Sequence, residues 1–365
     1  MIPLARPWLG DEEAEAARAV LATGMLVQGP RVEAFERELA EVCGRRHAVA
    51  CSSGTAALEL ALAALEIRDG SVLCPALSWP SPAHAIARAN AQLALVDVER
   101  DTWNASAAAL AAARRPDTRA AIVIDQFGNP ADHVAIAKAL PDLPTIVDAA
   151  CSIGATLHDR PSATFGTIAC LSFHPRKLIT TSEGGACLTD DPRIADRLRV
   201  FRNHGQRAPG DFVTPAGNQR LTEIAAAIGS VQLTRLDAIV ARRRAIAARY
   251  DAALRGRVGL PSPSPGGRPN FQTYGILVGA ERRDTIVGAL GEAGVQAGRL
   301  SYALHHIGSF SGLGDDARFP CASAIEASGL AIPIFGTMTD DEVERVIAAL
   351  LVALDRTDLD RRQDG

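Results

Sequence analysis

The chain has 365 residues, 47% of them hydrophobic and 22% charged, a balance typical of globular proteins with a large core. Its net charge of -4 gives no electrostatic basis for binding nucleic acid or an anionic membrane surface. No apolar run approaches the roughly 18 residues of a membrane-spanning helix, so we expect no membrane partner.

The seven cysteines, at positions 43, 51, 74, 151, 170, 187 and 321, never form a Cys-x-x-Cys pair. Several lie in strand-like apolar runs, where a free thiol behaves as a small hydrophobic group. We therefore expect no metal site. Residues 1–7 lack the charged start and apolar core of a signal peptide, so the reduced cytoplasm is the expected compartment.

Helical and strand-like patterns alternate through the first 150 residues. Helical periodicity covers residues 11–21, 31–42 and 56–65, and strand-like runs cover residues 47–51, 71–74, 93–96, 120–124 and 145–147. Asp125 and Asp148 directly follow the last two runs. This alternation predicts an α/β fold with a mainly parallel sheet, whose ligands gather at the carboxyl ends of the strands.

The pattern changes in the second half of the chain. Strand-like runs at 167–173 and 186–189 are followed by a helix at 192–201 and one long helical stretch at 221–254. The proline- and glycine-rich segment 261–267 predicts a linker. A strand-like run at 271–278 and helices near 282–293 and 340–354 then suggest a small α+β domain. We therefore expect a large domain over residues 1–250 and a small C-terminal domain over residues 251–365.

Lysine is rare, since only Lys138 and Lys177 stand against 36 arginines. A lysine amine can lose its proton and form a Schiff base, whereas a guanidinium stays protonated. From this count alone, an incidental surface lysine is the simpler explanation. Lys177, however, lies between an apolar strand and the turn Gly184-Gly185, and these surroundings favour a chemical role.

Three further features gain meaning beside Lys177. Ser53-Gly54-Thr55 joins a strand to a helix N-terminus, which can bind a phosphate, although a plain helix cap explains these residues taken alone. Asp148 could pair with a protonated pyridine nitrogen, bind a metal or cap a helix. Trp79 could cover a flat ring or pack in the core. Together these groups form the set that pyridoxal 5′-phosphate (PLP) requires.

The order of these motifs resembles the DegT/DnrJ-type sugar aminotransferases, which have the aspartate-aminotransferase-like PLP fold (fold type I). The resemblance covers nearly the whole chain. Its motifs are Gln28-Gly29-Pro30, Phe35-Glu36, Ser53-Gly54-Thr55-Ala56-Ala57-Leu58, Val96-Asp97-Val98, Val147-Asp148-Ala149-Ala150, Ser172-Phe173, Glu183-Gly184-Gly185, Arg202-Asn203-His204-Gly205 and Gly217-Asn218-Gln219-Arg220-Leu221.

The resemblance implies roles for the residues that face the cofactor ring. Lys177 is expected to form the Schiff base with the cofactor and then to act as the general acid and base of the reaction. Asp148 is expected to keep the pyridine nitrogen protonated, so that the ring accepts electrons. Trp79 is expected to stack on the ring.

The resemblance also implies a phosphate site shared between two subunits. Gly54, Thr55 and Ser172 are expected to bind the phosphate. Asn218 is expected to reach it from the neighbouring subunit, which implies a homodimer with shared active sites. Glu183 lies in the family's glycine-rich turn near the substrate.

Two positions depart from the family pattern. The family usually has glutamine, or sometimes histidine, where Cys151 stands, and a thiol is a poor hydrogen-bond donor to the ring hydroxyl. Either Ser152 or water replaces that contact, or the contact is absent. Ser182 stands where the family's turn often has glycine, and serine is strained there if the backbone requires a positive φ.

The resemblance implies a two-stage transamination. The expected amino donor is L-glutamate, and the expected acceptor is a nucleotide-linked keto-deoxysugar or, in some members, a keto-cyclitol. Arg299, Tyr302, His305 and His306 lie in a stretch that resembles the substrate-side loop. Arg299 could bind a diphosphate through two parallel hydrogen bonds, or be an exposed arginine at a helix end.

Two alternatives compete with the aminotransferase. A PLP-dependent sugar dehydratase of the same fold has histidine in place of the Schiff-base lysine, and His174 lies three residues too early for that role. A regulatory protein without catalysis would be expected to lose the lysine or the carboxylate. Both Lys177 and Asp148 are present, which favours the aminotransferase.

Overall fold

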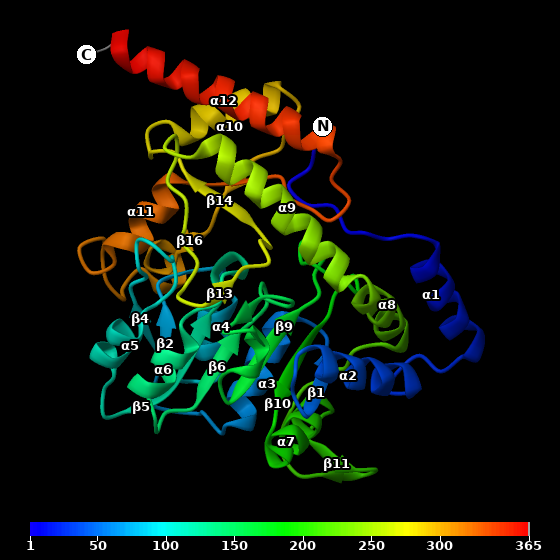
Figure 1. Ribbon diagram of the computed structural model, residues 1–365. Helices are drawn as coiled ribbons and strands as arrows, with labels where there is room; N and C mark the ends of the chain where they lie inside the picture. Colours follow the sequence, from blue (N-terminus) through cyan, green and yellow to red (C-terminus); the bar gives the residue numbers. More distant parts are fainter. Residues whose placement is uncertain (364–365) are drawn as a thin grey trace.

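A seven-stranded sheet forms the centre of the computed structural model, which describes residues 1–363 and the side chains of residues 1–357 (Figure 1). Its strand order is β1-β10-β9-β6-β5-β2-β4, and the four pairs from β9 to β4 are parallel. Only β10 runs antiparallel to its neighbours. The mainly parallel sheet predicted from the sequence is confirmed. The strands are β1 (His47–Cys51), β2 (Ser71–Pro75), β4 (Gln92–Val96), β5 (Thr118–Ile124), β6 (Thr145–Asp148), β9 (Ile168–Ser172) and β10 (Gly185–Thr189).

Helices cover both faces of this sheet, because successive strand residues point to opposite faces. In β1, Val49 packs into a core with α3, α4 and α7, whereas Ala48 packs into a second core with α2 and α8. A third cluster joins α5 and α6 to the sheet. The helices are α2 (Pro30–Val42), α3 (Gly54–Ala64), α4 (Ser81–Arg88), α5 (Ala107–Ala113), α6 (His133–Ala139), α7 (Pro192–Arg202) and α8 (Glu223–Thr234), and α1 (Asp11–Thr23) lies outside α8.

The predicted continuous helical stretch at 221–254 is wrong. It is divided into α8 and α9 (Leu236–Leu254), which meet at a bend of 57°. Arg235, at the bend, donates to the carbonyl of Trp8 and to Glu13, so contacts with the N-terminal segment fix the break. No single helix in the described chain is long and apolar enough to cross a membrane, and α8 and α9 meet that test only as a bent pair.

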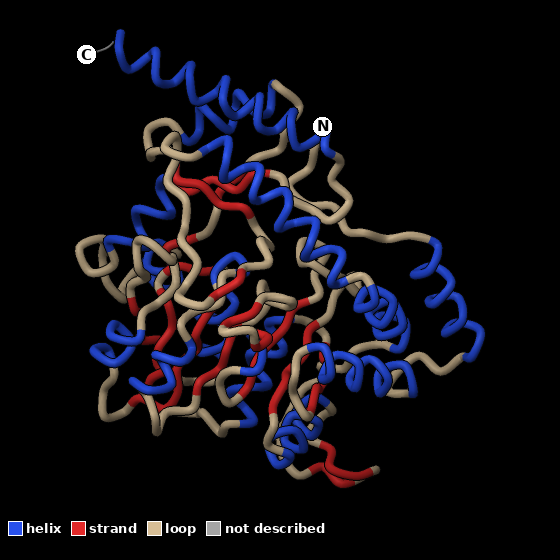
Figure 2. The backbone as a smooth tube through the Cα atoms, viewed as in Figure 1, coloured by secondary structure: helices blue, strands red, loops and turns tan. Residues whose placement is uncertain are grey.

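The C-terminal region contains its own small sheet of β14 (Tyr274–Leu277), β17 (Gly329–Ile332) and β15 (Gly298–Arg299), all antiparallel (Figure 2). It packs with α10 (Arg283–Glu292) and α12 (Asp340–Gln363) around a core that also contains Ile246, Tyr250 and Leu254 of α9. We propose that the small domain begins within α9, close to the expected division after residue 250.

Short strands form three further small sheets, one of which joins the two regions. A two-residue ladder pairs β3 (Leu77–Ser78) of the large domain with β16 (Tyr302–Ala303). The linker strand β13 (Gly267–Arg268) pairs with β7 (Thr156–Leu157), which pairs with β8 (Arg160–Pro161). The hairpin β11 (Gln206–Ala208) and β12 (Asp211–Phe212) projects from the large domain (Figure 1). The remaining elements are η1 (Gln126–Gly128), η2 (Ser162–Thr164), η3 (Leu304–His306), η4 (Gly308–Phe310) and α11 (Pro320–Ser328).

Candidate active site

Lys177 and Asp148 meet at the carboxyl ends of two neighbouring parallel strands, β6 and β9. Asp148 is the last residue of β6, and its carboxylate accepts a hydrogen bond of 3.1 Å from the backbone N–H of Ala150. Lys177 lies in the loop after β9, where its Nζ donates to the Sγ of Cys151 at 3.2 Å. The charges of Lys177 and Asp148 interact. An amine and a carboxylate thus lie at the edge of the sheet where such folds bind ligands.

Burial of Asp148 favours the protonated form of its carboxyl group. Burial raises its pKa from 3.8 to about 6, against the positive charge of Lys177, which lowers the pKa. Burial also raises the pKa of the Cys151 thiol, again against the charge of Lys177. A buried carboxylate of this kind gains stability from a cationic partner, and a protonated pyridine nitrogen is such a partner.

Gly54 and Ser172 form a narrow cradle beside these two residues. A Cβ at position 54 would lie 2.7 Å from the Cβ of Ser172, and a Cβ at Gly185 would lie 2.3 Å from the carbonyl oxygen of Ser53. Only glycine allows both close approaches. Ser53 caps α3 by accepting from the N–H of Ala56 at 3.0 Å, while the N–H groups before it have no carbonyl partner within the helix. Free N–H groups at a helix N-terminus are a physical basis for phosphate binding.

Thr55 and Trp79 lie at the rim of this region. The Thr55 hydroxyl is 2.9 Å from that of Ser81, and Thr55 also lines an open groove of about 590 Å³ together with His84, Arg88 and Phe310. Trp79 is 64% exposed, so its indole is not in the core and is free to cover a ligand. Its ring centroid lies 5.7 Å from that of Tyr302.

Asn218 and Glu183 present exposed side chains. Next to Asn218, the carbonyl of Gln219 accepts from the N–H of Ser52 at 2.9 Å, so this segment runs beside the cradle of its own chain. The Asn218 amide oxygen accepts a long 3.4 Å bond from the N–H of Arg220. The backbone carbonyl of Glu183 accepts a hydrogen bond of 2.8 Å from the hydroxyl of Thr181.

The substrate-side candidates divide into two groups. Tyr302 contacts Trp79, and the guanidinium of Arg299 lies 5.6 Å from the centroid of the Tyr302 ring. Arg299 also donates to Glu326 at 3.1 Å, so its charge already has a partner. His305 is buried and bonds to residues of the small-domain side rather than to the Lys177 region.

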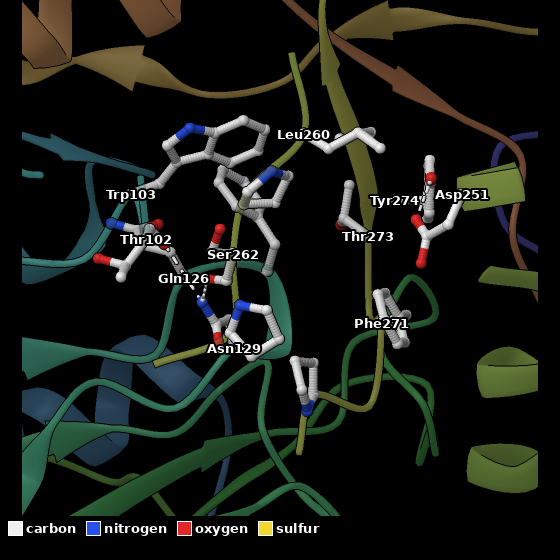
Figure 3. A pocket seen from close by; sticks show the side chains of 15 residues that line it. Thr102, Trp103, Gln126, Asn129, Asp251, Leu260, Ser262, Phe271, Thr273 and Tyr274 are labelled. Atoms are coloured by element: carbon white, nitrogen blue, oxygen red, sulfur yellow. Dashed lines mark hydrogen bonds between the residues drawn. The ribbon is translucent and has the colours of Figure 1, made fainter. Parts of the chain in front are cut away.

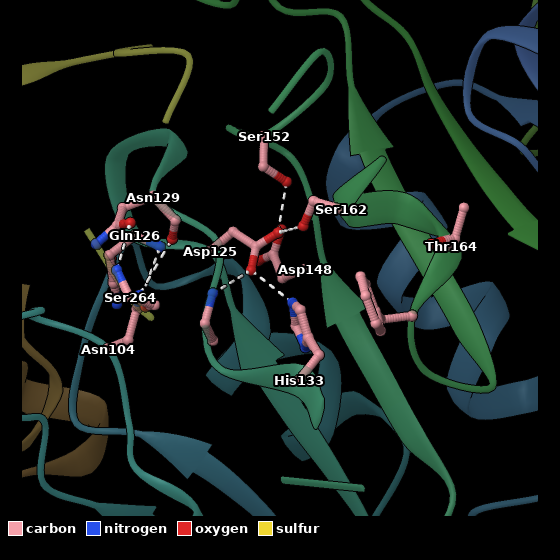
Figure 4. Close-up of polar contacts among 12 residues, drawn as sticks. Asn104, Asp125, Gln126, Asn129, His133, Asp148, Ser152, Ser162, Thr164 and Ser264 are labelled. Atoms are coloured by element: carbon pink, nitrogen blue, oxygen red, sulfur yellow. Dashed lines mark hydrogen bonds and ion pairs between the residues drawn. The ribbon is translucent and has the colours of Figure 1, made fainter. Parts of the chain in front are cut away.

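A buried hub around Asp125 supports the site and was not found from the sequence (Figure 4). Its carboxylate accepts from His133 at 2.8 Å, from the N–H of Ala131 at 2.9 Å and from Ser152 at 2.6 Å, and it also accepts from Ser162. Burial opposes ionisation, but the charge of His133 and these bonds hold the pKa of Asp125 below its usual range. Its position at the end of β5, beside Asp148, was the only signal in the sequence.

The Asp125 hub removes one alternative from the cofactor contacts. The Ser152 hydroxyl is buried and donates to Asp125. It is therefore not available to replace the glutamine or histidine that the family usually has at position 151. Cys151 itself contacts Lys177. His174 is engaged in its own turn, where its Nδ1 accepts from the N–H of Arg176 at 3.2 Å.

Ser182 has a positive φ of 73°, in the left-handed region that favours glycine. We expect Ser182→Gly to raise the free energy of unfolding by up to about 1 kcal/mol, because strain relief outweighs the added flexibility of the unfolded chain. Urea denaturation measures the change, and Ser182→Ala, which keeps the Cβ, serves as the control. A clear loss of stability in the glycine variant would contradict the strain.

A separate cavity of about 80 Å³ lies behind this region, between the large domain and the linker (Figure 3). Aromatic side chains of Trp103, Phe127, Phe271 and Tyr274 line it. Its carboxylate, Asp251, accepts from the Tyr274 hydroxyl at 2.6 Å. Neither Lys177 nor Asp148 lines this cavity.

Solved structures similar to this chain share its whole fold. TlmJ from Streptoalloteichus hindustanus, an aminotransferase, is 32% identical with a TM-score of 0.91, covering 98% of this chain and 100% of its own. DesV of S. venezuelae is 31% identical with a TM-score of 0.90 over 94% of each chain. Spr1654 from Streptococcus pneumoniae, assigned as a sugar aminotransferase, is 25% identical with a TM-score of 0.93, covering 97% of this chain and 98% of its own.

The sequence comparison agrees with these structures. Residues 7–351 match the DegT/DnrJ/EryC1/StrS aminotransferase family, which spans both the sheet and the small domain. Two of the residues that carried the resemblance, Lys177 and Asp148, lie close enough for their charges to interact. The chain therefore belongs to the DegT/DnrJ/EryC1/StrS aminotransferase family.

Proposed function

We propose that this chain is a PLP-dependent aminotransferase that transfers an amino group from L-glutamate to the keto group of a nucleotide-linked deoxysugar in two stages. One observation carries the proposal: an amine and a buried carboxylate, Lys177 and Asp148, interact at the strand end where Ser172 packs against Gly54 at a helix N-terminus. Spr1654 has been solved in PLP and PMP forms, which supports PLP as the cofactor.

The residues present fit that cofactor at each end. Its aldehyde forms a Schiff base with amines, and its protonated ring withdraws electrons from the reacting carbon. Asp148 ends a strand with a raised pKa, so a ring cation above it would be its natural ion pair. Gly54 lies against Ser172 at the N-terminus of α3, where N–H groups could bind a phosphate. Trp79 offers an exposed aromatic face.

Lys177 moves the proton in this proposal. Its amine would hold the cofactor, and its Nζ would be the group that accepts and returns the proton of the substrate carbon. Asp148 maintains the charge that makes this proton acidic. Cys151 accepts from the same Nζ at 3.2 Å and so holds the amine at the carboxyl end of β6.

The acceptor is proposed from the rim of the site. Tyr302 lies beside Trp79, so an acceptor stacked near the ring would contact both side chains. Arg299 would meet a diphosphate only after leaving Glu326, to which it donates at 3.1 Å. A keto-cyclitol remains the alternative acceptor, because it needs no partner for a diphosphate.

A sugar dehydratase is less well supported. ColD, a GDP-4-keto-6-deoxymannose-3-dehydratase, has a TM-score of 0.87 but is 24% identical, which shows the fold alone. A lysine at position 177, in contact with Cys151 and interacting with Asp148, supports transamination.

The acceptor class can be tested in a single turnover. The enzyme charged with pyridoxamine 5′-phosphate is mixed with a panel of nucleotide-linked keto-deoxysugars and keto-cyclitols. We expect the cofactor spectrum to return to the PLP form with a nucleotide-linked keto-deoxysugar. A response to keto-cyclitols alone would replace the acceptor, and no response to L-glutamate in the reverse half-reaction would remove the proposed donor.

The homodimer with shared sites predicts that Asn218→Ala weakens PLP binding about 10-fold or more, because a phosphate contact from the partner is lost. Fluorescence titration of the cofactor-free protein measures the affinity. Mixing the Asn218→Ala and Lys177→Ala chains provides the control, since only a shared site regenerates one complete site in each mixed dimer. No gain of activity on mixing would contradict the sharing.

A further inference from the structure

A cluster of imidazole and carboxylate groups lies on the small-domain side, outside the Lys177 region. Its ligand atoms come from His305, His306 and Asp316, and all of them lie within 4.8 Å of one another. The Nε2 atoms of His305 and His306 lie 3.2 Å and 2.6 Å from the same oxygen, Oδ1 of Asp316. No cysteine takes part, so the cysteine spacing had no bearing on this cluster.

We propose that His305, His306 and Asp316 bind one divalent transition-metal ion of the zinc type. Zinc bonds to imidazole nitrogen and carboxylate oxygen at about 2.0–2.2 Å, which places tetrahedral ligands about 3.4 Å apart. The two Nε2 atoms now lie at hydrogen-bond distances of 2.6 Å and 3.2 Å from Oδ1 of Asp316, and all three atoms lie within 4.8 Å of one another, so an outward shift would admit the ion. Three protein ligands leave a fourth position for water.

Surrounding side chains contact each of the three ligands. The Nδ1 of His306 bonds to Glu326 at 2.5 Å, which matches the carboxylate–histidine–metal arrangement of zinc sites. Ser323 donates at 2.6 Å to Oδ1 of Asp316, the oxygen that both imidazoles approach, and its hydroxyl also lies 3.0 Å from Nε2 of His305, so it would have to turn away when the ion binds. His305 is buried with its ring 4.9 Å from that of Phe319.

His305 lacks this outer support. Among the described residues, its buried Nδ1 has no hydrogen-bond partner. A metal-bound ring normally donates from its second nitrogen. We therefore expect weaker binding than at a four-ligand structural zinc site. Protons compete for the same site, because a doubly protonated His306 would also satisfy both of its carboxylate neighbours.

The position of the cluster suggests what the ion would do. His305 and His306 belong to η3, which directly follows the β16 strand beside Trp79. Asp316 lies ten residues further along, past Phe310, which lines the groove that contains Thr55. An ion bound to both segments would fix this loop and hence one wall of the groove. It would stabilise the acceptor side without taking part in proton transfer.

Metal binding is tested on the PLP-loaded full chain after treatment with a chelator. Zn²⁺ is titrated in competition with a chromophoric chelator at pH 7.5. We expect one ion per chain, with binding at least 10-fold weaker in Asp316→Asn and in His306→Gln. Asp315→Asn and His47→Gln, which change the same residue types outside the cluster, should bind like the unaltered chain. Mg²⁺, which prefers oxygen ligands, should not compete.

The proposal is overturned if the unaltered chain binds no stoichiometric Zn²⁺, or if Asp316→Asn binds it as tightly. Hydrogen exchange on the unaltered protein keeps the test decisive if the variants fail to fold. Zn²⁺ should slow amide exchange in residues 304–323, and unchanged exchange there would count against the site. Neither readout depends on transamination, so the metal site and the proposed function can fail separately.

Discussion

Lys177→Ala is expected to lower kcat by about 1000-fold or more, the largest effect of any single change in this chain. In the proposed function, the variant loses both the amine that would bind the cofactor and the group that would carry the proton. The visible absorption of the bound cofactor should also change. Stopped assays with L-glutamate and a keto acceptor measure the rate, and absorbance spectroscopy follows the cofactor.

The composition of the chain supplies a matched control for this experiment. Lys138, exposed on α6, is the only other lysine, and Lys138→Ala should retain full activity. Borohydride reduction followed by peptide mapping should place the trapped cofactor at position 177. A cofactor trapped at another position, or a Lys177→Ala variant with normal turnover, would remove the basis of the proposed mechanism.

Asp148→Asn is expected to lower kcat about 100-fold or more, because the neutral amide cannot stabilise a protonated ring. A pH dependence should be lost with it. In the cofactor-free protein the pKa of Asp148 is raised to about 6, so the carboxylate is charged above that pH. As the pH falls below about 6 it takes up a proton, and PLP affinity should fall by up to about 10-fold per pH unit.

The stability of the cofactor-free protein gives an independent reading of the same group. Because the folded pKa of about 6 lies above the ordinary 3.8, the folded state binds the extra proton between these values. Stability is therefore lost as the pH rises through this window, by at most about 3 kcal/mol. Asp148→Asn should lack this loss. Equal pH profiles for the two proteins, in affinity and in stability, would contradict the raised pKa.

Local patterns predicted most of the fold. The strand-like runs became β5 and β6, because buried parallel strands are short and apolar, and their polar ends marked the active-site edge. The break between α8 and α9 was not predictable, since Thr234 and Arg235 carry no helix-breaking signal. The bend depends on contacts between Arg235 and residues more than 200 positions away, which no local window contains.

The contiguous motifs of the candidate site could be predicted from the sequence, whereas its tertiary contacts could not. Gly54 and Lys177 stand in short contiguous motifs, and the structure brings their motifs to one edge of the sheet through β9. The Asp125 hub is assembled from separate segments, with Ser162 lying 37 residues away, so only the folded chain reveals it. The pairing of Arg299 with Glu326 is likewise a tertiary contact, and it changes what Arg299 must give up to meet a substrate.

The ladder between β3 and β16 has a mechanical consequence. Tyr302 pairs directly with Ser78, the residue before Trp79, so the backbone on the acceptor side is tied to the backbone that carries the indole. A rotation of the small domain would move β16, and through its pairing with β3 it would tilt the Trp79 indole at the same time. Substrate-induced closure and the clamping of the cofactor ring would then be a single movement instead of two successive ones.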